Sequence, residues 1–149
     1  MPTCASLVQT GIRRPMMSRA KQRMSRKYSN TQRALASRAI LDMDAFWAQT
    51  FAASGTGDLN YCDLFTHLWL LRDQPPQPKT ELYPLMPNIS RRTAVKYVQH
   101  AIEHGMLNEE PCATDRRIRL ISLTPQAMTL IERFLDYTCL SFNAVGKEP

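Results

Sequence analysis

The chain has 149 residues, of which 44% are hydrophobic and 21% are charged, a composition typical of a globular domain with a buried core. No apolar run approaches the roughly 20 residues of a membrane span, and the four cysteines show neither a C-x-x-C pair nor histidines at ligand spacing. A membrane protein, a disulfide framework and a zinc site are therefore not predicted. With no secretory signal, we expect a protein of the reducing cytoplasm.

The net charge of +6 is concentrated at the start of the chain, where nine Lys or Arg residues precede the first acid, Asp42. Residues 1–29 show no sustained hydrophobic period, so we expect a mostly flexible basic arm. Such a segment is typical of a nucleic-acid-binding arm, of an organellar transit peptide or of a solvated tail without a role. Residues 30–149 are predicted to form a single domain.

A long helix is predicted over residues 30–54, with two apolar stripes about 140° apart. One stripe can face the helix's own domain, whereas the second needs another partner. Self-association is the simplest interpretation, and deeper burial within one domain is the alternative. The first stripe contains Ala36, Ile40, Met43, Trp47 and Phe51, and the second contains Ala34, Leu41, Ala45, Ala48 and Ala52.

The next predicted helix follows Gly57, with a capping-box-like pair at Asn60 and Asp63. A proline-rich connector, residues 74–78, separates it from a further helix predicted over residues 79–86. Pro84 lies too far inside that segment for a comfortable first turn, so we expect this helix to be short or irregular.

Residues 88–126 predict a capped helix, a hairpin and the start of another helix in direct succession. Ser90 is a good N-cap and Gly105 a left-handed stop, while the apolar residues Ala94, Val98 and Ala101 share one face of the helix between them. Two strands joined by the basic tip Asp115-Arg116-Arg117 should follow. Thr124-Pro125 then starts a last helix, predicted over residues 124–145, with an apolar face wider than one packing surface requires.

These motifs together resemble the MarR (multiple antibiotic resistance regulator) family. The resemblance covers roughly residues 59–135 and depends on the order of the motifs: Asn88 to Thr93 opening a helix, Gly105-Met106-Leu107, Asp115-Arg116-Arg117 and Leu123-Thr124. One departure concerns the first wing strand, where the family usually has an arginine that pairs with the wing aspartate. Here that place holds Glu109, so the usual pairing of Asp115 is not expected.

The resemblance implies a mainly α fold, a winged helix-turn-helix with a two-stranded β wing and long N- and C-terminal dimerisation helices. Residues 30–54 and 124–145 would be those helices, and residues 59–123 the DNA-binding part. The implied function is sequence-specific binding of double-stranded DNA as a homodimer, on a pseudo-palindromic site, in transcriptional regulation. This context favours the DNA-binding interpretation of residues 1–29.

Two arginines in the first turn of the capped helix support this interpretation, because cations are mildly unfavourable at a helix N-terminus. The same place suits a phosphate, which accepts from guanidinium and free backbone N–H groups. Arg117 would enter the minor groove. The predicted DNA-binding residues are Ser90, Arg91, Arg92, Thr93, Lys96, Gln99, His100, Arg116 and Arg117.

A winged-helix module that binds protein instead of DNA is the alternative function, and there the acidic balance from Asp42 onward would matter more. An enzyme is not expected, because the sequence has no phosphate loop, metal cluster or nucleophile pair. The resemblance also allows a small aromatic or phenolic effector in a crevice between the dimerisation helices and the winged domain. No residue identifies such a ligand, and no cofactor is predicted.

Overall fold

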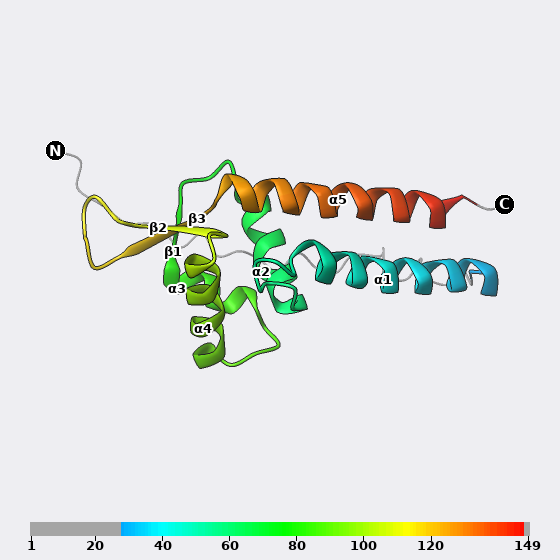
Figure 1. Ribbon diagram of the computed structural model, residues 1–149, viewed down its shortest axis with the longest axis horizontal. Helices are drawn as coiled ribbons and strands as arrows, with labels where there is room; N and C mark the ends of the chain where they lie inside the picture. Colours follow the sequence, from blue (N-terminus) through cyan, green and yellow to red (C-terminus); the bar gives the residue numbers. More distant parts are fainter. Residues whose placement is uncertain (1–27, 148–149) are drawn as a thin grey trace, which may run out of the picture.

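The computed structural model describes residues 28–147, so the predicted basic arm and Cys4 lie outside the described residues, apart from Tyr28 and Ser29. The chain is mainly helical with a small antiparallel sheet, which confirms the predicted fold class (Figure 1). The elements in chain order are α1 (Asn30–Thr50), α2 (Leu59–Leu70), β1 (Gln77–Pro78), α3 (Lys79–Leu82), the 3-10 helix η2 (Tyr83–Leu85), α4 (Arg91–Glu103), β2 (Leu107–Pro111), β3 (Arg119–Leu123) and α5 (Pro125–Gly146).

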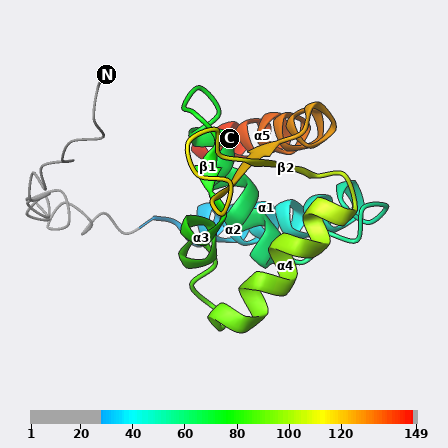
Figure 2. The ribbon, with the colours of Figure 1, turned by 90° about the vertical axis from the view of Figure 1, so that its left-hand side faces the viewer.

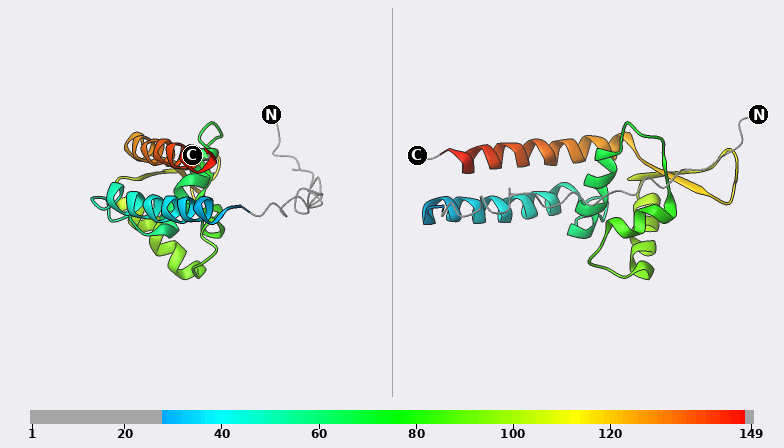
Figure 3. Two further views of the ribbon diagram at one scale, coloured as in Figure 1. Left: turned by 90° about the vertical axis from the view of Figure 1, so that its right-hand side faces the viewer. Right: turned by 180° about the vertical axis from the view of Figure 1, so that it is seen from behind.

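Helices α1 and α5 lie side by side in antiparallel orientation and project together from the body of the molecule (Figures 1 and 3). Between the two helices, the rings of Phe46 and Tyr137 stack with centroids 4.2 Å apart. The β2–β3 hairpin extends from the opposite end of the body. Within the described residues, none of the helices has the length and apolar character needed to cross a membrane.

The base of the helix pair is fixed by an aromatic cluster around Trp47, which is fully buried. Its ring stacks on Phe51 at 3.9 Å and meets the edge of Phe134 of α5 at 4.9 Å, and Phe65 of α2 lies 6.1 Å away. The indole Nε1 donates to the carbonyl oxygen of Thr56 at 3.2 Å, so its one polar atom is satisfied. This cluster joins α1, α2 and α5 into one core.

The start of α2 differs from the sequence-based expectation, whereas α1 begins at Asn30 as expected. Asp58, not Asn60, caps α2: its carboxylate accepts from the backbone N–H of Asn60 at 2.7 Å. Asp58 also accepts from the hydroxyl of Tyr97 in α4 at 2.9 Å, so the cap serves tertiary packing as well. At α1, Ser29 and Gln32 form a reciprocal capping box, a pattern that the sequence contained and the prediction did not use.

The segment before α4 is irregular, as predicted from Pro84. It consists of a single α-helical turn followed by the 3-10 helix. The sequence did not predict β1, which pairs with β3 and makes the wing part of a three-stranded sheet in the order β1-β3-β2. A two-residue strand rich in proline has no hydrophobic period of its own, and only its pairing with β3 identifies it.

The predicted boundaries of α4 and α5 are confirmed. The side chain of Ser90 accepts from the N–H of Thr93, and Gly105 has a φ of 73°. The hydroxyl of Thr124 accepts from the N–H of Ala127 at 3.1 Å and donates to the carbonyl oxygen of Gly105 at 2.8 Å. Thr124 therefore connects the end of α4 to the start of α5.

Thr124→Ala should destabilise the protein by about 1–2 kcal/mol, because it removes the cap and leaves partly buried backbone groups without a partner. Thr124→Ser, which keeps the hydroxyl, should lose much less. Urea unfolding followed by circular dichroism measures both. Equal losses in the two variants would show that the methyl group of Thr124, and not its hydroxyl, stabilises this junction.

Candidate nucleic-acid interface

Helix α4 crosses the end of the body from which the hairpin extends (Figure 2). Its inner face consists of the fully buried Ala94, Val98 and Ala101. The opposite face carries exposed polar side chains at helical spacing, which are Arg92, Lys96, Gln99 and Glu103. Three of the four are predicted DNA-binding residues, so the structure places them together on one solvent-facing stripe.

The first turn of α4 contains no acidic residue. Ser90 caps this turn, and its hydroxyl also donates to the hydroxyl of Thr93 at 3.0 Å. The side chains of these two predicted site residues are therefore hydrogen-bonded within the cap. The guanidinium of Arg91 lies 5.2 Å from the ring centre of Tyr83, a cation–π contact with η2. Arg92 points to solvent beside the free backbone N–H groups of the turn, where an anion is stabilised.

His100 behaves differently from its predicted neighbours. Its Nε2 lies 3.1 Å from the carbonyl oxygen of Gly55, and its ring stacks on His104 with centroids 3.9 Å apart. A Cβ atom on Gly55 would come within 2.8 Å of this nitrogen, so the contact is close. His100 therefore anchors the loop before α2 to α4, and we omit it from the proposed DNA contacts.

At the tip of the wing, Asp115 pairs with Arg117. Its carboxylate accepts from Nε and Nη2 of Arg117 at 3.2 and 3.3 Å, and from the backbone N–H of Arg117 at 3.0 Å. Hydrogen bonds from Arg117 lower the pKa of Asp115 below its usual value. The side chain of Arg117 is 92% exposed, so the pair orients a guanidinium that remains fully available to solvent. Arg116 is also exposed.

Glu109 lies on the inner face of the sheet, directly opposite the buried Ile121. Its carboxylate accepts from Nζ of Lys79 at 2.7 Å and from Nε of Arg119 at 2.8 Å. These hydrogen bonds, first that of Lys79, hold the pKa of Glu109 below its usual value of 4.5. A charge at a half-buried position needs partners, and here they come from α3 and β3.

Glu109 is recognisable in the sequence as a departure from the family pattern, but its partners Lys79 and Arg119 were not predicted. The available signal was the alternation of β2, in which Leu107 is buried, Asn108 and Glu110 are exposed, and Glu109 turns inward. An acid at a core-facing strand position predicts a nearby cation. Which cation it is depends on the pairing of β1 with β3, because that pairing brings Lys79 to the sheet.

The cysteines of the described region are free thiols: Cys62, Cys112 and Cys139. Burial raises the pKa of Cys62 to about 11, so its thiol is protonated at neutral pH. Hydrogen bonds from Thr114 lower the pKa of Cys112, which lies at the base of the wing loop. Residues 28–147 contain no cluster of three or more His, Cys, Asp or Glu side chains suited to a metal ion.

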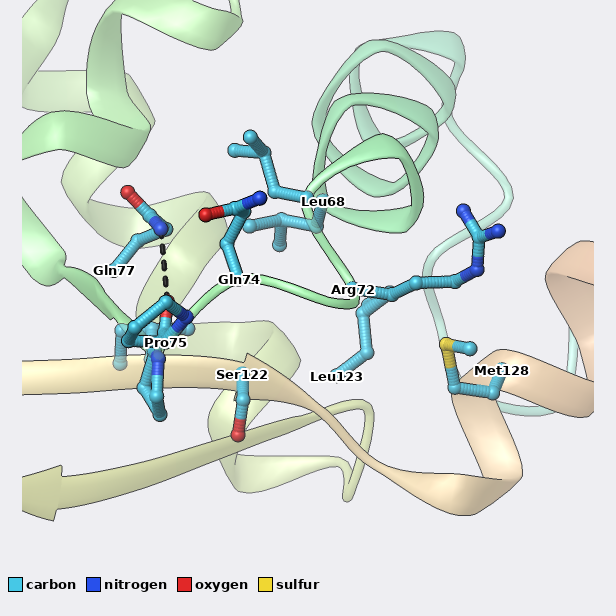
Figure 4. A pocket seen from close by; sticks show the side chains of 11 residues that line it. Leu68, Arg72, Gln74, Pro75, Gln77, Ser122, Leu123 and Met128 are labelled. Carbon is cyan, nitrogen blue, oxygen red and sulfur yellow. Dashed lines mark hydrogen bonds between the residues drawn. The ribbon is translucent and has the colours of Figure 1, made fainter.

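A small hollow of about 160 Å³ lies between the end of α2, β3 and the start of α5 (Figure 4). Two of its polar side chains are engaged by neighbouring groups. The guanidinium of Arg72 stacks 3.8 Å above the ring of Trp69, and Nε2 of Gln77 donates to the carbonyl oxygen of Pro75 at 2.9 Å. Ligand pockets usually measure about 300–1,000 Å³, so this hollow is too small for a ligand of the size expected for an effector.

Solved structures with a similar fold include proteins described as transcriptional regulators. The chain aligns with MarR at a TM-score of 0.51, 15% identity and 76% and 79% coverage of the two chains. The chain has the fold of the MarR regulators. A mutant of S. aureus MepR bound to an oligodeoxyribonucleotide gives a TM-score of 0.60, 13% identity and coverages of 83% and 86%. The repressor CouR bound to a 23-mer DNA duplex gives a TM-score of 0.50, 19% identity and coverage of 73% of each chain.

No protein-family model and no curated protein sequence matches the chain. The resemblance to the MarR family is therefore confirmed at the level of the fold, by three-dimensional similarity at low sequence identity. The MarR-like winged helix consists of α3, α4 and the β2–β3 wing, and α1 and α5 form the long helices at its other end.

Glu109→Gln should lower the free energy of unfolding at pH 7 by about 1 kcal/mol, because it weakens charge-assisted bonds to Lys79 and Arg119. The pKa of Glu109 is lower in the folded protein than in the unfolded chain, so its carboxylate stabilises the fold above pH 4.5. This contribution is lost as the pH falls through the lower, folded value. Thermal melts at pH 7 and at acidic pH should therefore differ for the wild type and the variant only at the higher pH.

Glu110→Gln is the matched control, because it removes the same charge from the next residue, which faces solvent. Its melting temperature should stay close to that of the wild type at both pH values. A similar loss in both variants would assign the effect to overall charge and not to the contacts of Glu109.

Proposed function

We propose that the chain is a non-enzymatic transcriptional regulator that binds double-stranded DNA as a homodimer. The observation that carries the proposal is the outward stripe of α4, where Arg92 and Lys96 face solvent above a fully buried apolar face. A cationic helix face beside a hairpin with an exposed arginine tip is the arrangement that enters the major groove and contacts an adjacent groove.

The electrostatics of the wing favour DNA over the alternative of a protein partner. Of the three acids at the wing, Glu109 is paired with Lys79 and Arg119 and Asp115 with Arg117, while Glu110 faces solvent. The exposed arginines at the tip, Arg116 and Arg117, are thus a more prominent feature of this surface than its acids. The proposed contacts are Ser90, Arg91, Arg92, Thr93, Lys96, Gln99, Arg116 and Arg117.

A homodimer is supported by apolar surface on the two long helices. The second stripe of α1 is exposed along its whole length, including Leu41 at 67%. On α5, Leu140 and Phe142 are exposed at 70% and 56%, and an open groove of about 530 Å³ lies between Phe142 and the start of α1. A monomer would leave this surface in contact with water.

We therefore assign the dimer contacts to residues 30–54 and 124–145 and the DNA contacts to residues 59–123. A two-fold dimer would place its two α4 helices about one DNA turn apart, roughly 34 Å, on a pseudo-palindromic site. Residues 1–29 would add phosphate contacts through their basic side chains. A small-molecule effector remains part of the proposal without an assigned site.

Arg92→Ala and Arg117→Ala should each weaken DNA binding by about 1–3 kcal/mol if they contact bases, or reduce the slope of log K against log salt by about 1 if they contact phosphates. Melting temperatures should change little, because both side chains are exposed. Salt-titrated fluorescence anisotropy measures the affinities. Lys147→Ala, which removes an exposed cation beyond the proposed dimer helices, is the control and should bind like the wild type.

Wild-type affinity that is independent of salt would argue against a DNA-binding protein and for the protein-interaction module. Equal losses in the Arg92, Arg117 and Lys147 variants would mean that total charge, and not the α4 and wing surface, determines binding.

Leu41→Glu should convert the dimer to a monomer at micromolar concentration, because it places a carboxylate in the apolar stripe of α1. Leu70→Glu is the control: Leu70 is equally exposed, at 70%, but lies at the end of α2. Multi-angle light scattering gives the mass of each variant. A monomeric wild type at this concentration would exclude the proposed homodimer.

A further inference from the structure

Lys79 is the point at which three elements meet. It follows β1 directly and begins α3, and its ammonium donates to Glu109 of β2 at 2.7 Å and to the amide oxygen of Gln99 of α4 at 3.1 Å. The side chains of Lys79 and Glu109 are both only 19% exposed. This lysine is therefore part of the structure at the junction between the recognition helix and the wing.

The contacts of Gln99 give its amide a single orientation. Lys79 can only donate, so it must face the amide oxygen, and the carboxylate of Glu103 accepts from the amide nitrogen at 3.0 Å. Rotating the amide by 180° would place its nitrogen, a donor, against the ammonium of Lys79. It would also place its oxygen, an acceptor, against the carboxylate of Glu103. The amide thus keeps one lone pair and one N–H free, in a fixed order, on the exposed face of α4.

An amide in a fixed orientation suits one base edge in the major groove. Adenine presents the N6 amino donor next to the N7 acceptor, which pair with an amide oxygen and an amide N–H respectively. We propose that Gln99 is a specificity-determining residue that reads an adenine, and that Lys79 is the positioning residue that orients it. This inference rests on the proposed DNA-binding function. It adds the identity of the base that is recognised and the residues that determine this specificity.

Glu109 fixes the position of Lys79 in turn. Its carboxylate also binds Arg119 at 2.8 Å, so it is held from the sheet side and offers Lys79 a defined acceptor. Without Glu109, the long and flexible side chain of Lys79 would not be held beside Gln99. The wing strands therefore determine the orientation of a side chain on the recognition helix.

In-vitro selection of duplexes with the full-length wild type should yield a site with a preferred A·T pair that Gln99→Ala no longer prefers. Substituting that pair should weaken wild-type binding by about 5- to 150-fold, the range that corresponds to a bidentate contact. In Lys79→Met this ratio should fall to nearly the value for Gln99→Ala, and the double variant should lose nothing further. Anisotropy titrations on the matched and substituted duplexes give these ratios.

Lys79→Arg keeps a charged donor and should restore most of the discrimination. Glu109→Gln should reduce it, and Glu110→Gln should leave it unchanged. The loss of one positive charge in Lys79→Met lowers affinity for every duplex, but only a positioning role changes the ratio between duplexes. Circular dichroism melts establish that each variant is folded, and Lys79→Gln replaces Lys79→Met if the latter does not fold.

The inference is overturned if the Lys79→Met variant weakens binding to matched and substituted duplexes by the same factor, or if the pair lost in Gln99→Ala is not A·T. In either case the wild type still binds DNA, and the proposed function stands. A wild type that selects no duplex and binds random DNA without salt dependence refutes the proposed function, and this inference with it.

Discussion

The burial of Trp47 is the constraint on which the arrangement of the molecule depends. Two long antiparallel helices have no intrinsic fixed angle to a winged helix, and here one indole ring contacts residues of α1, α2 and α5 while its nitrogen bonds the carbonyl of Thr56. Aromatic rings packed edge to face tolerate little rotation. The cluster therefore fixes the direction of the helix pair relative to α2, and in the proposed dimer it would contribute to the spacing of the two α4 helices.

A second set of contacts connects the recognition helix to the wing. Thr124 ties the end of α4 to the start of α5, and the Lys79–Glu109–Arg119 cluster ties α3 and the sheet to Gln99. Where the resembled family has an arginine on the first wing strand, this chain has an acid with two cationic partners. The negative charge of Glu109 is balanced by cations on the neighbouring elements. Asp115 pairs with Arg117 within the wing tip itself.

The charge distribution separates two kinds of surface. Around α4 and the wing, the acids Glu109 and Asp115 are paired, and Arg92, Lys96 and Arg116 face solvent together with the acids Glu103 and Glu110. On α1 and α5 the exposed surface includes large apolar side chains. A polyanion is attracted to the first surface and a second apolar face to the second. The proposed function requires both, since neither a monomer nor an acidic wing would bind a pseudo-palindrome well.

Local signals in the amino-acid sequence were sufficient to predict several helices and their ends. Ser90, Gly105 and Thr124-Pro125 set the ends of α4 and α5 through caps and backbone preferences, and hydrophobic period identified their buried faces. Contacts between residues that are distant in the sequence could not be predicted and are seen only in the folded protein. The pairing of β1 with β3 brings Lys79 to Glu109, and the loop before α2 takes His100 away from the polar face of α4. Periodicity places a side chain on a face of its own helix or strand, but its partner there is determined by how the elements pack.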